Sequence, residues 1–155
     1  MINRYHYETP VGLVCIEENE AAITALYFDS KKQEERDKET ETPLLKEAHR
    51  QLAEYFEKKR TEFDLPLKPE GTDFQKKVWA ALCTIPYGET RSYGEIAKQT
   101  GNEKACRAVG GANNKNPIMI FIPCHRVIGA DGSLVGFGGG LQAKRYMLDL
   151  EKGEI

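Results

Sequence analysis

Short apolar runs in the first third of the chain predict β-strands. Residues 13–16 and 25–28 are two such runs, each containing β-branched or aromatic side chains. The polar residues 17–20 between them predict a turn, and the charged stretch 31–42 predicts a solvated loop. Apolar side chains at alternate positions over 63–67, interrupted by a proline, are typical of an edge strand. The pattern therefore predicts a small antiparallel sheet.

A helix is predicted between these strands by apolar residues at helical spacing. Pro43 suits the first turn of a helix, where the missing amide hydrogen is not needed. The stripe expected to be buried consists of Leu45, Ala48, Leu52, Tyr55 and Phe56. Residues 1–68 are thus predicted to form a first domain in which one helix covers the sheet, and nothing in its sequence indicates catalysis.

The pattern becomes helical after a hinge at 68–71 that contains proline and glycine. Thr72 and Gln75 have the spacing of a capping box, in which each side chain bonds the backbone amide of the other residue. Trp79 is predicted to lie in the core, and the sequence Pro-Tyr-Gly at 86–88 ends the helix. The helix face expected to be buried contains Phe74, Val78, Ala81, Leu82 and Ile85. We expect a mostly helical second domain over 69–155.

Two further helices with a short turn between them have the signature of a helix-turn-helix. Ser92 and Glu95 repeat the capping-box pattern, residues 100–102 predict the turn with Asn102 as a cap, and the second helix is expected over 103–113. Each helical glycine costs roughly 1 kcal/mol relative to alanine. We expect close contact to offset that cost, either with another helix or with a partner. The small residues that would make this contact are Ala108, Gly110, Gly111 and Ala112.

Composition narrows the class of protein. The 155 residues are 40% hydrophobic and 30% charged, which suits one globular domain or two small ones. No uncharged run is long and apolar enough to span a membrane, and the first residues lack the apolar core of a secretion signal. The four cysteines are scattered without a Cys-x-x-Cys pair, which argues against a zinc ribbon or a disulfide framework and favours a reducing cytoplasm.

Charge is unevenly distributed along the chain. Residues 1–70 carry a net charge of −5 and residues 71–155 a net charge of +3, which together give the −2 of the whole chain. A basic second half suits an anionic partner such as nucleic acid, although a difference of this size is common in proteins that bind none.

Cys124 is the clearest candidate for chemistry, because it follows an apolar run and opens the sequence Cys-His-Arg-Val. A cysteine becomes nucleophilic when a base, a positive charge or a helix N-terminus stabilises its thiolate. His125 and Arg126 come next, so two basic groups lie near the sulfur in any fold. Adjacent side chains seldom bond one another directly, which predicts a relay through water. The other cysteines lack such neighbours and are interpreted as small hydrophobic residues.

The sequence around Cys124 resembles one family over residues 72–151. The chain is similar to the O6-alkylguanine-DNA alkyltransferases, repair proteins that move an alkyl group from guanine onto a cysteine and are used once. The combination of Pro-Cys-His-Arg-Val with Arg-Ala-Val-Gly upstream is highly specific, whereas the first half matches only loosely. The matching positions are 74–79, 88–90, 92–93, 96–97, 107–112, 116–117, 122–128, 139–148 and 151. The resemblance implies an α/β (α+β) fold with a ribonuclease H-like first domain.

The resemblance also implies a catalytic role for each matched residue. Cys124 would accept the alkyl group, and His125 would act as a base through water, oriented by Glu151. Asn116 would hold the active-site loop in place. Tyr93 would hydrogen-bond the flipped guanine and help to neutralise it as it leaves. The thioether on the cysteine would not be hydrolysed, so each protein molecule would react once.

Double-stranded DNA carrying O6-alkylguanine is the partner that the resemblance implies, with O4-methylthymine as a further substrate. Arg107 would fill the gap that the flipped base leaves in the stack, and Asn102 would contact the DNA strand. Ala108 and Gly111 are small enough for the helix-turn-helix to enter the minor groove. A monomer without a cofactor is expected.

Val127, Phe137 and Gly138 are expected to line the substrate pocket. Phe137 stands where many relatives carry tyrosine, and Gly138 where some carry a hydroxyl or a larger residue. We therefore hypothesise that the pocket admits alkyl groups larger than methyl.

No metal site is predicted. Some family members bind a metal through cysteines and histidines near the N-terminus. Here the residues available for such a site are widely spaced along the chain, namely His6, Cys15 and His49.

Three other functional classes stay open on the sequence alone. A non-catalytic alkyltransferase-like binder of alkylated DNA would lack the acceptor cysteine, which this chain keeps. A plain helix-turn-helix regulator would leave residues 123–127 and Glu151 unexplained. A cysteine hydrolase built on Cys124 and His125 would turn over repeatedly, whereas an alkyl acceptor reacts once.

Overall fold

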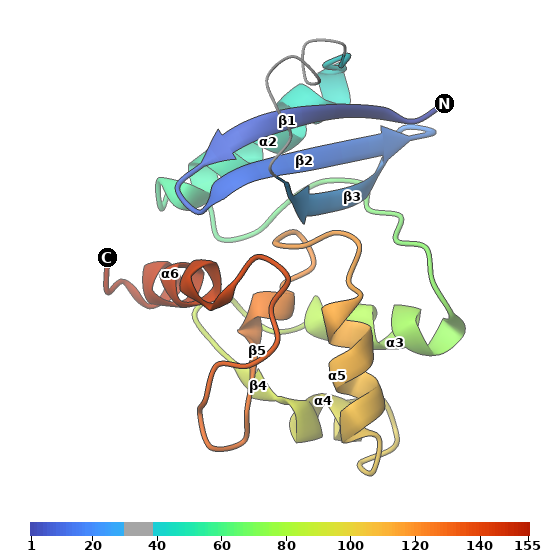
Figure 1. Ribbon diagram of the computed structural model, residues 1–155, viewed down its shortest axis with the longest axis vertical. Coiled ribbons are helices and arrows are strands. Elements are labelled where there is room, and N and C mark those ends of the chain that lie inside the picture. Colours follow the sequence, from blue (N-terminus) through green and yellow to red (C-terminus); the bar gives the residue numbers. More distant parts are fainter. Residues whose placement is uncertain (30–38) are drawn as a thin grey trace.

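The structure is a computed structural model that describes residues 1–29 and 39–155, so most of the predicted loop at 31–42 lies outside the described residues. Figure 1 shows a sheet with one helix against it, stacked on a group of shorter helices. No helix among the described residues is both long and apolar enough to cross a membrane. The elements in chain order are β1 (Asn3–Thr9), β2 (Gly12–Asn19), β3 (Ala22–Phe28), α2 (Pro43–Phe56), α3 (Asp73–Leu82), β4 (Arg91–Ser92), α4 (Tyr93–Gln99), α5 (Cys106–Asn114), the 3₁₀ turn η1 (Cys124–Arg126), β5 (Val127–Ile128) and α6 (Leu141–Lys152).

The first half is a three-stranded antiparallel sheet in the order β1-β2-β3, as the sequence pattern predicts. Strand β1 was missed, and the predicted turn at 17–20 was wrong. Strand β2 continues to Asn19, and the turn is made by Glu20 and Ala21, which both have positive φ. The glutamates 17 and 18 stay in β2 because this central strand pairs on both sides, and those backbone bonds outweigh a low strand propensity.

The predicted edge strand at 63–67 is much shorter than expected. Leu67 alone forms a bridge, to Ile23 of β3. The Ile23 amide donates to the Pro66 carbonyl at 2.7 Å, and the Lys68 amide donates to the Ile23 carbonyl at 2.8 Å. Pro66 has no amide hydrogen to donate, which limits the pairing.

Helix α2 covers the sheet and confirms the predicted stripe. The Thr42 hydroxyl accepts a hydrogen bond from the Leu45 amide, and Pro43 occupies the first helical position. The buried side chains include all those predicted, Leu45, Ala48, Leu52, Tyr55 and Phe56.

The second half confirms the mostly helical prediction, with two corrections. Both capping boxes are formed, at the starts of α3 and α4. Phe74, predicted to be buried, is 36% exposed because it lies in the first turn of α3, at an end of that helix. Helix α5 begins at Cys106 and not at 103, because the Asn102 side chain accepts from the Lys104 amide and holds a turn there instead of capping the helix. Trp79 is buried, and its indole nitrogen donates to the Ala112 carbonyl at 2.8 Å, which joins α3 to α5.

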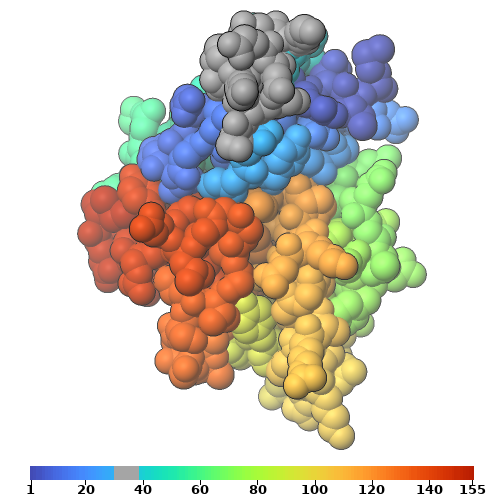
Figure 2. Space-filling model, viewed as in Figure 1, coloured from blue at the N-terminus to red at the C-terminus, as the bar shows by residue number. Residues whose placement is uncertain are grey.

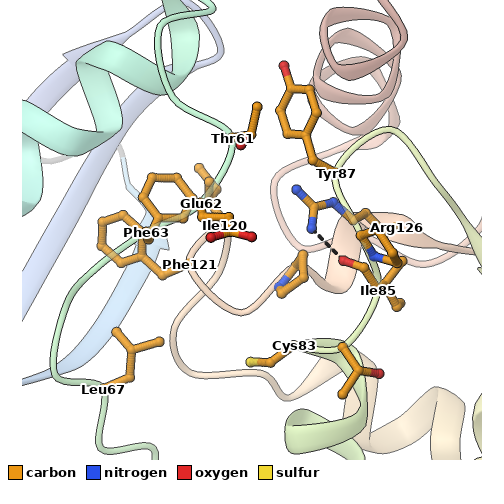
Figure 3. A pocket seen from close by; sticks show the side chains of 13 residues that line it. Thr61, Glu62, Phe63, Leu67, Cys83, Ile85, Tyr87, Ile120, Phe121 and Arg126 are labelled. Atoms are coloured by element: carbon orange, nitrogen blue, oxygen red, sulfur yellow. Dashed lines mark hydrogen bonds between the residues drawn. The ribbon is translucent and has the colours of Figure 1, made fainter.

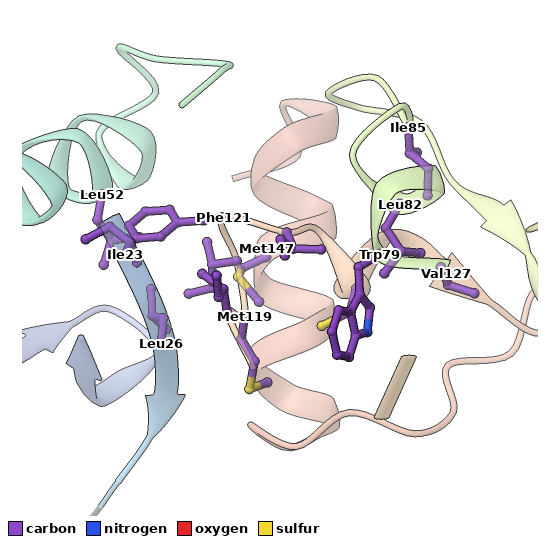
Figure 4. Close-up of a cluster of buried hydrophobic side chains, with 14 of the residues drawn as sticks. Ile23, Leu26, Leu52, Trp79, Leu82, Ile85, Met119, Phe121, Val127 and Met147 are labelled. Carbon is purple, nitrogen blue, oxygen red and sulfur yellow. The ribbon is translucent and has the colours of Figure 1, made fainter. Parts of the chain in front are cut away.

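The two halves share one apolar core. Figure 4 shows Ile23, Leu26 and Leu52 from the sheet and α2 facing Met119 and Phe121 from the second half. The backbone is joined there as well. The Leu26 amide donates to the Pro117 carbonyl at 2.9 Å, and the Met119 amide donates to the Leu26 carbonyl at 3.0 Å. The segment that leads to Cys124 is therefore anchored along β3, which fixes where the cysteine lies.

Candidate active site

Cys124 begins the 3₁₀ turn η1, and the loop before it is held by Asn116. The Asn116 amide group donates to the Ile122 carbonyl at 2.8 Å, and its carbonyl oxygen accepts from the Ile118 amide at 3.0 Å. Ile120, inside this loop, has a φ of 71°, an unfavourable conformation for a β-branched residue. Such strain persists only where the surrounding contacts impose it, and it is commonest at functional sites.

The Cys124 thiol is almost completely buried, with 2% of the residue exposed. Burial raises the pKa of this thiol to about 11, while a hydrogen bond from Asn116 and the positive charge of Lys144 oppose the rise. The sequence placed two basic residues, His125 and Arg126, near the sulfur and gave Lys144 no role. Arg126 pairs with Glu151, and the positive charge that most lowers the pKa of the thiol is that of Lys144.

His125 is fully buried and hydrogen-bonded to Glu151, with 2.7 Å between Nε2 and the carboxylate oxygen Oε2. Burial is the largest effect on its pKa and lowers it, so the ring is neutral near pH 7. A carboxylate can only accept, so Nε2 carries the hydrogen and Nδ1 carries the lone pair. Nδ1 is buried and has no hydrogen-bond partner among the described residues. The ring is therefore held as a base with its accepting nitrogen free.

Glu151, in helix α6, accepts hydrogen bonds from four residues, which come from three parts of the chain. Besides His125, it accepts from Arg126 Nε at 2.8 Å, from the Tyr55 hydroxyl at 2.5 Å and from the Gly88 amide at 3.4 Å. Burial by itself would raise the pKa of this carboxyl, but the hydrogen bonds and charges of His125 and Arg126 outweigh it and lower the pKa to about 2. Glu151 is therefore an anion that orients His125.

Tyr55 and Lys144 are site residues that sequence reasoning missed. Tyr55 comes from α2, in the half where nothing indicated catalysis, and no local signal in the sequence marks it. Lys144 lies inside the matching segment and was given no role, although a lysine on the buried face of an amphipathic helix is a usable signal. Its ammonium donates to the carbonyls of Val127 at 2.5 Å and Val135 at 3.0 Å, and burial lowers its pKa to about 8.

The segment that carries Val135 is held by two side chains that also interact with the Cys124 thiol. The Val135 carbonyl accepts from Lys144 and also from the Tyr93 hydroxyl, at 3.1 Å. Both donors also interact electrostatically with Cys124. Tyr93 thus faces the same region as Cys124, as its implied role requires.

The three expected pocket residues differ in their surroundings. Val127 is fully buried in the short strand β5. Phe137 is half-buried and packs edge-on against Phe28 of β3, with ring centroids 5.9 Å apart. Gly138 is exposed, and a Cβ built there would lie 3.5 Å from the Met119 methyl group, an ordinary contact. A small side chain therefore fits at position 138.

The residues expected to contact DNA lie together on one exposed surface. Arg107, Ala108 and Gly111 are exposed on α5, and Asn102 is exposed in the turn before it. In Figure 2 this region, coloured yellow to light orange, forms a lobe that projects at the end of the molecule opposite the sheet. The small residues of α5 suit both kinds of contact that the sequence left open, with the rest of the domain and with a partner. Gly110 lies beside the Tyr93 ring, whereas a Cβ at Gly111 would meet nothing within 4 Å.

A cavity of about 410 Å³ lies between the two halves, beside the turn η1. Figure 3 shows Phe63 and Phe121 on one side of it and Tyr87 and Arg126 on the other. Pro123 and Arg126 line it, whereas Cys124 does not. This cavity therefore does not lead to the sulfur.

These features define the class of protein. A helix-turn-helix presents an exposed face with an arginine, and the same half of the chain holds a buried cysteine next to a His–Glu pair. The fold and the site are those of a DNA-binding protein with a thiol centre.

The comparisons with known proteins identify the family. The family model for the 6-O-methylguanine DNA methyltransferase DNA-binding domain matches residues 73–153, and the model for the ribonuclease-like domain of the same family matches residues 3–69. The methylated-DNA–protein-cysteine methyltransferase of Methanosarcina barkeri is 52% identical, with 96% of each chain covered. The constitutive enzyme of that name from Bacillus subtilis is 47% identical over 94% of this chain and 92% of its own.

Solved structures agree with these matches. The Mycobacterium tuberculosis O6-methylguanine methyltransferase superimposes with a TM-score of 0.88 at 47% identity, covering 100% of this chain and 95% of its own. The M. tuberculosis protein in complex with DNA gives 0.87 at 48% identity, with coverages of 97% and 92%. The chain belongs to the methylated-DNA–protein-cysteine methyltransferase family, which confirms the resemblance seen in its sequence.

Proposed function

We propose that this protein repairs double-stranded DNA by moving the alkyl group of O6-alkylguanine onto Cys124, once per molecule. The observation that carries the proposal is the buried pair of His125 and Glu151, which leaves Nδ1 of the histidine as a free acceptor in the residue next to the cysteine. O4-methylthymine is proposed as a second substrate.

The proton and the alkyl group move in a defined order. The Cys124 proton passes through a water molecule to His125 Nδ1, and Glu151 stabilises the imidazolium that forms. The thiolate attacks the alkyl carbon in line, a C–S bond forms, and the C–O bond breaks with its electron pair going to the guanine oxygen. Tyr93 hydrogen-bonds the base and helps to neutralise it. A thiol with a raised pKa needs such a base, because little thiolate exists beforehand at neutral pH.

Substrate entry requires the Val135 segment to move away from Cys124. Two hydrogen bonds, from Tyr93 and Lys144, hold the Val135 carbonyl in place. A nucleobase that enters can replace this carbonyl as the acceptor for both donors. The groups that close the empty site are then the groups that bind the base.

The two halves divide the work, with residues 1–68 as a support domain and 69–155 as the domain that binds DNA and transfers the alkyl group. The support is chemical as well as mechanical, because the Tyr55 hydroxyl donates to the carboxylate that orients His125. We propose that the protein acts as a monomer, since every residue in this mechanism comes from one chain.

The function is tested by incubating the purified protein with duplex DNA that carries a labelled methyl group on the O6 of one guanine. One label per protein molecule is expected, with no further transfer on adding fresh DNA. Repeated turnover would point to a hydrolase, and binding without transfer would point to an alkyltransferase-like binder or a regulator.

Arg107→Ala is expected to slow transfer from duplex DNA about 10²-fold, because nothing then fills the gap left by the extruded base and unstacking costs a few kcal/mol. Transfer from the free O6-alkylguanine base should be unchanged, since no stack has to be opened. Single-turnover rates on both substrates measure the difference. Lys98→Ala, a change of an exposed cation on α4, serves as the control. An equal loss on both substrates would contradict the role of Arg107.

The pocket hypothesis predicts that O6-benzylguanine reacts at a rate within about tenfold of O6-methylguanine, since a tenfold ratio corresponds to about 1.4 kcal/mol. Gly138→Ser should lower the benzyl rate more than the methyl rate, because a side chain fits there without strain and narrows the pocket. Competition between the two substrates gives the ratio. A strong methyl preference in the unchanged protein would contradict the hypothesis.

A further inference from the structure

The sheet brings together three side chains whose donor atoms differ in kind. His6 of β1 lies directly opposite Cys15 of β2 in the antiparallel register. The carboxylate of Glu39, which precedes α2, joins them, and one donor atom from each residue lies within 4.8 Å of the other two. Wide spacing in the sequence was therefore the wrong reason to exclude a metal site, because strand pairing places His6 and Cys15 side by side.

His49, the third residue considered from the sequence, lies elsewhere. It sits on α2 and stacks on the Tyr7 ring with centroids 4.1 Å apart. Tyr7 follows His6 in β1, and alternate residues of a strand point to opposite faces. His49 and the His6 cluster are thus on opposite faces of the sheet.

His6 is clamped between two carboxylates. Its Nδ1 lies 2.7 Å from Glu39 Oε2, and its Nε2 lies 2.8 Å from Asp29 Oδ2, while the His6 side chain is 1% exposed. Two carboxylates therefore face one imidazole, and each ring nitrogen has a carboxylate oxygen within hydrogen-bond distance.

We propose that His6, Cys15 and Glu39 form a binding site for a divalent transition metal of the zinc class. Imidazole nitrogen, thiolate and carboxylate are the donors that Zn²⁺ takes in proteins, and a mixed set with sulfur disfavours Mg²⁺ and Ca²⁺. Asp29 lies on the other ring nitrogen, where metal-bound histidines usually donate their remaining N–H to a carboxylate. That second carboxylate fixes the ring so that Nδ1, on the Glu39 side, points at the metal.

Metal binding needs only a small adjustment. Bonds of about 2.1 Å in tetrahedral geometry separate neighbouring donor atoms by about 3.4 Å. The Nδ1–Oε2 pair, now 2.7 Å apart, must open by less than 1 Å, and water completes the coordination. The Cys15 thiol releases its proton to solvent as the metal–sulfur bond forms. The metal would tie β1 and β2 to the segment that enters α2, far from the chemistry at Cys124.

The test uses Co²⁺ as an optical probe and Zn²⁺ for stoichiometry on the full-length protein. After gel filtration the protein should retain one equivalent of Zn²⁺, and Co²⁺ should give the near-ultraviolet band of a thiolate–cobalt bond. At a hundredfold excess over its Kd, zinc should raise the Tm by about 5–10 °C. A chelator should reverse that rise and leave the rate of methyl transfer unchanged.

Variants assign the site. Cys15→Ala and His6→Gln should lose the band, and Asp29→Asn should bind about 10–100-fold more weakly. His49→Gln and Cys124→Ser should keep both the band and the zinc, which excludes the other histidine and the reactive cysteine. If His6→Gln fails to fold, Cys15→Ala in a background lacking Cys83, Cys106 and Cys124 decides the assignment. Absence of the band in the unchanged protein, its persistence in Cys15→Ala, or its loss in Cys124→Ser would overturn the proposal.

Discussion

Cys124→Ser is expected to abolish alkyl transfer while leaving the fold and DNA binding intact. A serine hydroxyl ionises far less readily than a thiol and is a much weaker nucleophile toward carbon, so the base at His125 cannot compensate. The change is nearly isosteric, and the Asn116 hydrogen bonds to the Ile122 carbonyl and from the Ile118 amide are independent of the residue at position 124. The measurement is label transferred from methylated duplex DNA, together with binding to the same duplex.

The matched control is Cys83→Ser. Cys83 is a free, exposed cysteine at the end of α3, and the charge that lowers the pKa of its thiol is that of Arg126, whereas Lys144 acts on Cys124. This variant should transfer one methyl group per molecule at the normal rate. If Cys124→Ser still accepts label, or if Cys83→Ser loses it, the assignment of the acceptor fails.

Glu151→Gln is expected to lower both stability and rate. Glu151 is the shared acceptor for His125, Arg126 and Tyr55, and removing one partner of a buried charge pair typically costs roughly 3–5 kcal/mol. For a chain of this size that lowers the Tm by roughly 10 °C. Without the carboxylate, the imidazolium is no longer stabilised, and the rate should fall about 10²-fold or more. Thermal unfolding and single-turnover transfer at a temperature where the variant is folded measure the two effects.

The pH dependence of stability separates the charge of Glu151 from its shape. Its pKa is lowered to about 2 in the folded protein, so its stabilisation is present above the unfolded value of about 4.3 and is lost as pH falls from there toward 2. Glu151→Gln should not show that part of the loss of stability at low pH, because the glutamine side chain does not titrate. The free energy of unfolding, measured with denaturant at about pH 5 and about pH 3, shows whether stability falls as predicted, because this range spans the pKa of the unfolded state. A variant as acid-sensitive as the unchanged protein would contradict the prediction.

Tyr55→Phe gives a graded comparison with Glu151→Gln. It removes one hydrogen bond to the carboxylate and leaves His125 and Arg126 in place. A hydrogen bond to a charged group contributes about 1.5–3 kcal/mol, so the loss of stability should be smaller than in Glu151→Gln. A reduced transfer rate in this variant would show that the first half of the chain contributes to the chemistry.

Local features of this protein were readable from the sequence because they depend on residues close together in the chain. The capping boxes at Thr72 and Ser92 require only a partner three residues on, and both are formed. The buried stripe of α2 follows from helical spacing alone. The family was recognisable because its motif around Cys124 is contiguous, and the matches to known proteins confirm it.

What the sequence alone determined, then, is the type of strands β2 and β3 and of helices α2 to α5, the helix-turn-helix, the family and the cysteine worth examining. Tertiary structure decided the rest, because it depends on which distant residues meet. Folding buries the thiol, brings the charge of Lys144 to bear on it and places Tyr55 at Glu151, 96 residues further along the chain. Strand register likewise pairs His6 with Cys15, although their spacing in the chain does not suggest a contact. Hydrogen bonding and burial act through space, so a side chain's charge and chemistry are set by neighbours that no local pattern names.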